Sequence, residues 1–129
     1  MPAKFTYIIT VIFLLIFPII SITCEDDGTN YTNLSPNQPS NPAPADGALN
    51  QPVDVQLIWR CSDPDGDPLV YDIFFGTAMF PPGVASNQSD TTYQPDQLQH
   101  NTTYYWKIVA KDPRTYRTGP IWSFSTEEE

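Results

Sequence analysis

The segment "LQHNTTYYWKIVAK", residues 98–111, contains the clearest structural signal of the chain. Its inward-phase residues fall on alternate positions, at Tyr104, Trp106, Ile108 and Ala110. Successive side chains of a β-strand point to opposite faces, so this alternation predicts a strand with one buried face. We expect that strand to cover residues 103–111.

The same two-residue period recurs along the chain after residue 52. Residues 53–61 and 69–76 alternate in this way, and residues 91–95 and 120–126 form shorter runs. Residues 79–85 are rich in proline, which favours an edge strand. Six or seven short strands separated by turns predict an all-β antiparallel sandwich. Its expected core residues are Leu57, Trp59, Tyr71, Leu98, Tyr104, Trp106, Trp122 and Phe124.

Two features of this pattern resemble the fibronectin type III family. Trp59 lies in the strand expected at residues 53–61, which corresponds to the second strand of that family, where its core tryptophan is found. Leu98 precedes Tyr104 by six residues. That spacing is the one of the family's tyrosine corner, in which the tyrosine hydroxyl bonds back to the backbone. The string "SDPDGDPLVYDIFFGT…TTYQPDQLQHNTTYYWKIVAKD…TGPIWSFST" is similar to the bacterial surface-protein branch. The resemblance implies an immunoglobulin-like β-sandwich of about seven strands over residues 42–126, and it says little about function.

The N-terminus has the composition of an export signal. Lys4 precedes an apolar run over residues 5–22, and Cys24 follows it. A basic start and an apolar run are typical of a secretory signal, and the run is also long enough to span a membrane. An apolar run that ends at a cysteine resembles the bacterial lipoprotein signal, although Ser21 and Thr23 depart from the usual residues. Lipidation of Cys24 is the favoured interpretation, and ordinary cleavage and an uncleaved anchor remain open.

These patterns divide the chain into four parts. We expect a signal peptide or anchor at residues 1–23, a flexible tether rich in Pro, Asn and Ser at 24–41, the domain at 42–126 and an acidic tail at 127–129. The tether contains too few large apolar residues to offset the entropy of ordering it. The implied location is the bacterial cell envelope, membrane-tethered through the N-terminal lipid or anchor and outward-facing.

The composition of the chain argues against two classes of function, nucleic-acid binding and catalysis. The formal net charge of -9 disfavours a nucleic-acid partner, because phosphate binding needs clustered Lys and Arg. His100 is the single histidine, and its segment supplies no nucleophile and orienting acid for general-base catalysis. We therefore expect a non-catalytic binding or spacer module without a cofactor, whose ligand is a protein or a glycan.

The stretch "CSDPDGDPL", residues 61–69, allows two interpretations. Asp63, Asp65 and Asp67 have the alternate spacing that can converge on Ca²⁺, which would make the chain a calcium-stabilised adhesion module. The loop departs from the EF-hand pattern, and Asp, Pro and Gly are also the residues of an ordinary turn, which is the favoured interpretation. In a type III sandwich Arg114 and Arg117 fall at the same pole, where we expect them to neutralise the aspartates without a metal ion.

Outward-phase and loop residues form the expected contact surface. They are Phe74, Tyr105, Arg114, Tyr116 and Arg117. Cys61 lies on the inward phase and is expected to be a small buried hydrophobe. A disulfide between Cys24 and Cys61 is the alternative.

Overall fold

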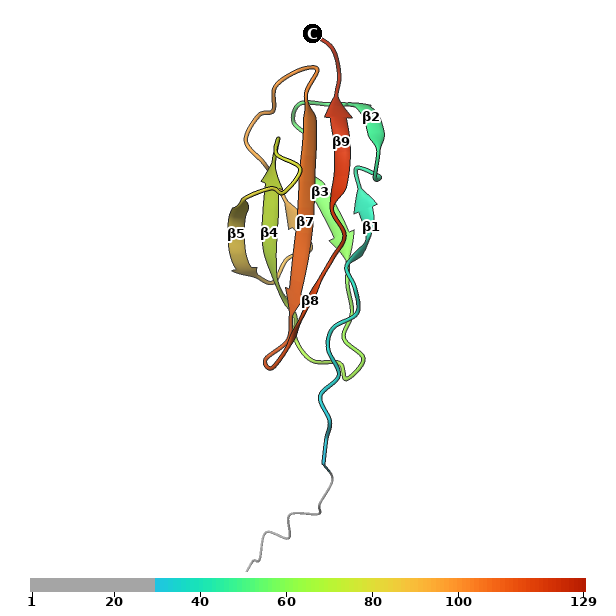
Figure 1. Ribbon diagram of the computed structural model, residues 1–129, viewed down its shortest axis with the longest axis vertical. Coiled ribbons are helices and arrows are strands. Elements are labelled where there is room, and N and C mark those ends of the chain that lie inside the picture. Colours follow the sequence, from blue (N-terminus) through green and yellow to red (C-terminus); the bar gives the residue numbers. More distant parts are fainter. Residues whose placement is uncertain (1–29) are drawn as a thin grey trace, which may run out of the picture. The chain divides into compact units, whose positions relative to one another are not determined.

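Residues 103–111 form the middle strand of the larger sheet, as their alternating pattern predicts. This strand, β7 (Thr103–Lys111), pairs antiparallel with β4 (Val70–Gly76) on one side and with β9 (Trp122–Thr126) on the other. β5 (Gly83–Gln88) pairs with the free side of β4 and ends the sheet there. Figure 1 shows these strands side by side.

The structure is a computed structural model that describes residues 30–129. Tyr31–Glu129 form one unit with its own core. Cys24 and the expected signal segment lie outside the described residues. Within residues 30–129 no helix is long and apolar enough to cross a membrane.

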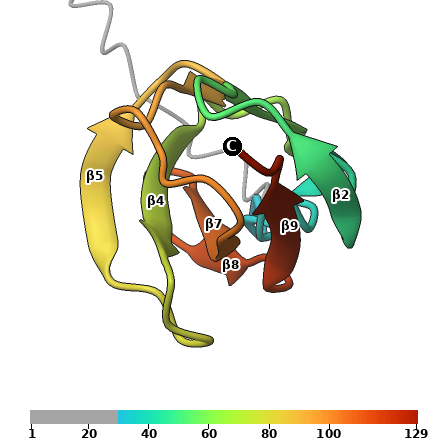
Figure 2. The same ribbon diagram turned by 90° about the horizontal axis from the view of Figure 1, so that it is seen from above.

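A smaller sheet covers the larger one. It contains β1 (Ser40–Ala43), β3 (Leu57–Arg60) and β6 (Thr92–Tyr93), in the order β1-β3-β6. Two further strands extend the larger sheet: β2 (Ala48–Gln51) runs parallel to β9, and β8 (Tyr116–Thr118) pairs with β7. Seen from above, the two sheets enclose the interior between them (Figure 2). The prediction of an all-β sandwich is confirmed, with one parallel pair added.

The core lies between the sheets and is dominated by aromatic rings. Trp59 meets the edge of Tyr71 with ring centroids 5.4 Å apart, and Phe75 stacks on Tyr104 at 5.2 Å. All eight expected core residues are buried, and the complete set is Leu57, Trp59, Tyr71, Ile73, Phe75, Leu98, Tyr104, Trp106, Ile108, Ala110, Trp122 and Phe124. Large buried side chains of this kind supply most of the free energy of folding.

Several strand boundaries differ from those expected. Residues 53–55 precede β3 in a turn, because the Val55 amide donates to the Pro52 carbonyl at 3.3 Å. Residues 79–82 form a loop, and the edge strand begins only at Gly83. β1, β2 and β8 were not expected, since few of their side chains are buried and their sequences lack the two-residue period.

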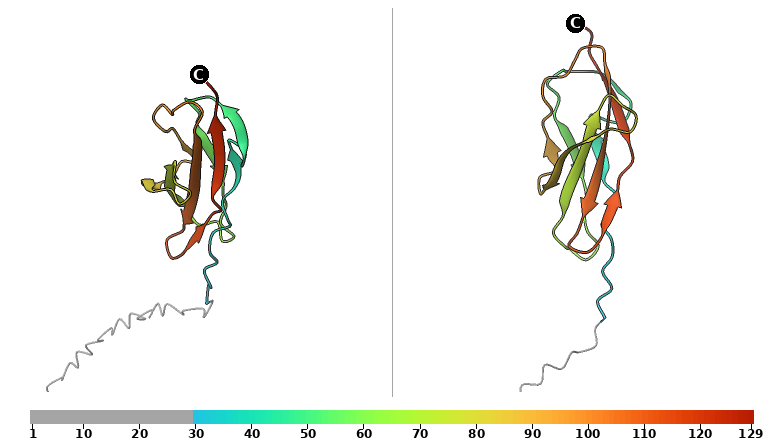
Figure 3. Two further views of the ribbon diagram at one scale, coloured as in Figure 1. Left: turned by 45° about the horizontal axis from the view of Figure 1, so that its top comes forward. Right: turned by 60° about the vertical axis from the view of Figure 1, so that its left-hand side comes forward.

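The folded unit also begins earlier than residue 42. The segment 33–39, which we call the strap, lies along the domain and leads into β1, as the cyan chain of Figure 3 shows. Pro36 and Pro39 are among the fully buried side chains. The expected tether therefore contains residues that belong to the domain, because two of its prolines supply packing surface rather than spacing.

Candidate functional site

The aspartate-rich stretch forms a closed turn after β3. Asp63 accepts the backbone N–H groups of Asp65 and Asp67 at its Oδ1 atom, at 2.8 and 3.2 Å. Gly66 has a φ of +75°, and its amide donates to the Asp63 carbonyl at 3.1 Å. A glycine adopts this left-handed conformation without the steric cost that a Cβ brings. The sequence at Asp63–Asp67 is thus sufficient to explain the local structure as a turn.

The same turn holds the strap. Asp65 Oδ2 accepts the Leu34 amide at 2.7 Å, and Asn37 donates its backbone amide to the Ser62 carbonyl and its side-chain amide to the Ser62 hydroxyl. On the neighbouring hairpin, Arg117 Nε donates to the Pro36 carbonyl at 3.4 Å. The Asp65 side chain therefore bonds to the strap, whereas the Asp63 side chain accepts its hydrogen bonds from within the turn.

Asp112, in the loop between β7 and β8, is the main functional candidate that the sequence analysis missed. It accepts hydrogen bonds from the backbone of Arg114, the backbone and hydroxyl of Thr115, and Asn33 Nδ2 of the strap. Burial by itself raises the pKa of Asp112, but these donors outweigh it and hold the pKa well below the usual aspartate range. The carboxylate is thus ionised across the physiological range.

Three carboxylates meet at this pole of the domain. One oxygen from each of Asp63, Asp67 and Asp112 lies within 4.8 Å of the others. Asp63 Oδ2 is buried and accepts no hydrogen bond from the described residues. Oxygen atoms from carboxylates on two loops form the kind of ligand set that a hard cation such as Ca²⁺ takes. Asp112 replaces Asp65 in the trio that the sequence suggested.

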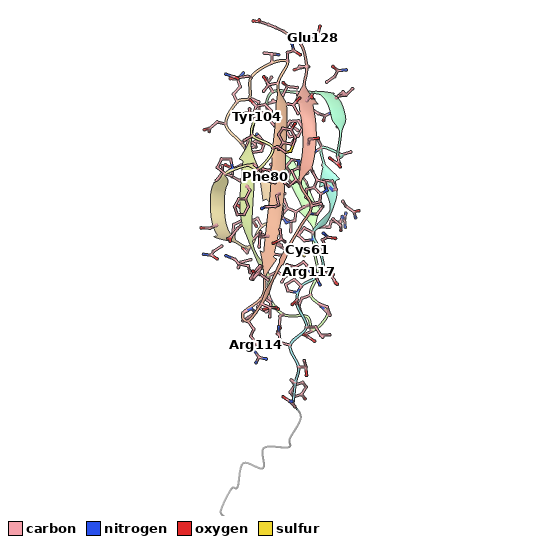
Figure 4. All side chains as sticks on the ribbon, in the orientation of Figure 1. Cys61, Phe80, Tyr104, Arg114, Arg117 and Glu128 are labelled. Carbon is pink, nitrogen blue, oxygen red and sulfur yellow. The ribbon has the colours of Figure 1, made fainter. Side chains whose placement is uncertain are left out.

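The expected neutralisation by arginine is wrong. Within residues 30–129 the one salt bridge joins Lys111 Nζ to Asp72 Oδ1 at 2.7 Å and involves no residue of this trio. Arg114 and Arg117 are exposed and lie at separate heights near the lower end of the domain (Figure 4). The last hairpin does reach the aspartate turn, as the topology suggested, but it contributes a carboxylate instead of a guanidinium.

The expected contact surface is not one patch. Phe74 and Tyr105 are half-buried on the larger sheet, and Lys107 Nζ lies 4.5 Å from the centre of the Phe74 ring. Tyr116 is exposed on β8. The most exposed apolar side chains of the larger sheet's loops were not expected: Met79 and Phe80 stand on the β4–β5 loop, which extends away from the sandwich in Figure 2.

Cys61 is half-buried beside the strap. Its thiol donates to the Asn37 carbonyl at 3.1 Å, and burial raises the pKa of the thiol. It forms no disulfide with any described residue. The alternative partner, Cys24, lies outside the described residues.

Comparison with known proteins supports the fold and no more. No protein-family model matches the chain, and no curated protein matches it in sequence. A fibronectin type III-like protein from Clostridium thermocellum superposes with a TM-score of 0.53 at 18% identity, covering 74% of this chain and 98% of that one. The type III domain of human fibronectin type III domain containing protein 3 gives a TM-score of 0.50 at 18% identity, over 78% of this chain and 94% of that domain. The described domain therefore has a fibronectin type III-like fold.

Proposed function

We propose that this chain is a non-catalytic binding or spacer module of the bacterial cell envelope, held at the outward face of a membrane by a lipid on Cys24. Modules of this fold are typically non-catalytic. The observation that carries the proposal is the bonding of the carboxylates beside the strap. Asp63, Asp65 and Asp112 accept backbone hydrogen bonds from their own turns and from the strap, which gives these side chains a structural role.

Charge and sequence support the remaining parts of the proposal. The net charge of -9 is unsuited to nucleic acid and suits a soluble exported domain. The apolar run over residues 5–22 ends just before Cys24, as in a lipoprotein signal. The ligand class is a protein or a glycan of the envelope.

The test is fractionation of cells that make the full chain. We expect the wild type in the membrane fraction and Cys24→Ser either released or retained as an unprocessed precursor of higher mass. Cys61→Ser is the matched control and should fractionate as the wild type does. Identical membrane retention and identical mass of the wild type and Cys24→Ser would exclude lipidation.

A second candidate function is a calcium-stabilised adhesion module. It is favoured by the trio of Asp63, Asp67 and Asp112, whose oxygens lie within 4.8 Å of one another, and by the buried Asp63 Oδ2 that no described donor satisfies. Carboxylates this close repel one another, and a divalent cation bound between them would relieve that repulsion. The three residues would hold the ion and so join the two loops of this pole.

Thermal unfolding with calcium, magnesium or chelator tests the second candidate. An ion that binds only the folded state at 100 times its Kd adds about 2.7 kcal/mol to the free energy of unfolding. Asp67→Asn is the informative variant, because the Asp67 side chain makes no hydrogen bond with the described residues, and it should abolish a calcium-specific shift. Asp65→Asn is the control and should keep that shift. Equal shifts with calcium and magnesium in all three proteins would contradict the calcium role.

A further inference from the structure

We propose that the strap, residues 33–39, is a positioning device that keeps the carboxylate pole of the domain close to the membrane. The inference rests on the proposed attachment through Cys24 and concerns a different property, the height at which the domain is held. Its basis is the number of residues that remain between the lipid and the first docked residue.

Chain length limits this height. Nine residue steps separate Cys24 from Asn33, the first strap residue that contacts the domain. A chain extends by at most about 3.6 Å per residue, so this spacer reaches no farther than about 32 Å. Had the whole expected tether been free, the eighteen steps from Cys24 to Pro42 would reach about 65 Å. Docking of the strap therefore removes about half of the available reach.

The strap is held along its whole length. Asn33 Nδ2 donates to Asp112 at 3.0 Å, the Leu34 amide donates to Asp65 at 2.7 Å, and the Asn37 amide donates to the Ser62 carbonyl at 2.9 Å. Pro36, between Leu34 and Asn37, and Pro39, after Asn37, are fully buried. Polar and apolar contacts alternate, so releasing the strap requires both to break.

The strap leaves the domain at the pole that carries the carboxylates. Asp63, Asp67 and Asp112 lie beside its first residues, and a hollow next to them is lined by Tyr31, Asn33 and Arg114. The C-terminus lies at the opposite pole (Figure 1). A lipid on Cys24 would thus keep the carboxylate pole near the lipid headgroups and present the other pole outward.

Fluorescence energy transfer from a label on the domain to a labelled lipid measures how far the carboxylate pole lies from the membrane. The full chain, lipidated in cells and reconstituted into phosphatidylcholine vesicles with an acceptor-labelled lipid, is labelled at position 114 through Arg114→Cys with Cys61→Ser as background. We expect high transfer in this protein. Insertion of a Gly/Ser segment between Asn30 and Tyr31 should lower it, which verifies that the assay reports height.

Two variants then test the strap itself. Pro36→Asp places a charge at a fully buried position and should release the strap, so transfer should fall towards that of the insertion variant. Gln38→Asp adds the same charge at an exposed position of the same segment and should leave transfer unchanged. Equal transfer in the parent and Pro36→Asp, with a lowered value in the insertion variant, would overturn the proposal.

Amide hydrogen exchange provides a readout that needs neither lipid nor Pro36→Asp. We expect the Asn37 amide, which donates to the Ser62 carbonyl, to exchange much more slowly than the same amide in the unfolded chain. Exchange of Asn37 at the unfolded-chain rate would overturn the proposal even if the variant failed to fold. A full chain that does not bind vesicles would count against attachment through Cys24, and Asn37 exchange would still decide whether the strap is docked.

Discussion

The backbone amide of Gln99 donates a hydrogen bond to the Tyr104 hydroxyl at 3.0 Å. This bond ties the loop after β6 to the first residues of β7, and the Tyr104 ring is stacked against Phe75 and Phe124. It is the tyrosine corner that the spacing of Leu98 and Tyr104 predicted. Tyr104→Phe should lower the free energy of unfolding by about 1 kcal/mol, because the part-buried Gln99 amide loses its acceptor. Denaturant unfolding measures the difference.

Tyr105→Phe is the control for that prediction. Tyr105 is half-buried on the opposite face of β7, and its hydroxyl makes no hydrogen bond with the described residues. Its loss should change stability by less than about 0.5 kcal/mol. Equal losses at the two positions would mean that the hydroxyl of Tyr104 contributes nothing specific.

Gly119 is expected to be intolerant of a side chain. It lies where the strap crosses the last hairpin, and an added Cβ would stand 2.9 Å from the Ile108 carbonyl oxygen and 3.3 Å from Pro39 Cβ. Gly119→Ala should therefore lower the free energy of unfolding by about 1–3 kcal/mol through overpacking. Gly83→Ala is the matched control, since its Cβ would make only an ordinary 3.6 Å contact with Phe74. A neutral Gly119→Ala would show that the strap is not packed there.

Truncation tests where the domain begins. A fragment of residues 42–129 retains every core residue and should still unfold cooperatively. A fragment of residues 31–129 should be more stable by about 2–5 kcal/mol, because it also buries Pro36 and Pro39 and keeps the hydrogen bonds of Asn37. Identical thermal transitions of the two fragments would place residues 31–41 outside the cooperative unit.

Stability should depend on pH through Asp72. Partial burial raises the pKa of Asp72, but the hydrogen bonds from Lys111 and the Asn87 backbone, with the Lys111 charge, outweigh it and leave the pKa below its usual value. A carboxyl with a lowered folded-state pKa stabilises the fold above its unfolded-state pKa of about 3.9, and this contribution is lost as the pH falls through the lower folded-state value. Denaturant unfolding at several pH values should show a smaller acid-induced loss for Asp72→Asn than for the wild type. An unchanged pH profile would contradict the assignment.

The sequence was most informative where side-chain size and period agree. Tyr104, Trp106, Ile108 and Ala110 occupy alternate positions of a nine-residue run and are all buried, and a helix would not bury all four on one face. The two-residue period gave a wrong strand boundary at Val53 and Val55. Both residues are half-buried and in phase with β3, but they lie in the turn that precedes it. β8 could not be found this way, because all three of its side chains are exposed and only backbone hydrogen bonds define it.

The structure of the carboxylate pole could be predicted in part from the sequence. The turn chemistry of Asp63 and Gly66 follows from local sequence, since both act within a few residues. The role of Asp112 could not be predicted, because it depends on contacts between two loops and the strap. These segments are far apart in sequence, and no local sequence pattern indicates that they lie together. The strap could not be predicted from composition either. Pro36 and Pro39 are typical of a flexible spacer, and only the structure shows that the domain buries them.

Intact mass and sequencing of the N-terminus of the exported protein test the central claim, attachment through Cys24, most directly. We predict a mature chain that begins at Cys24 and carries acyl chains, so that its mass exceeds that of residues 24–129 by the mass of the lipid. A mature chain that begins after Cys24, or one that retains Met1 without added mass, would contradict it.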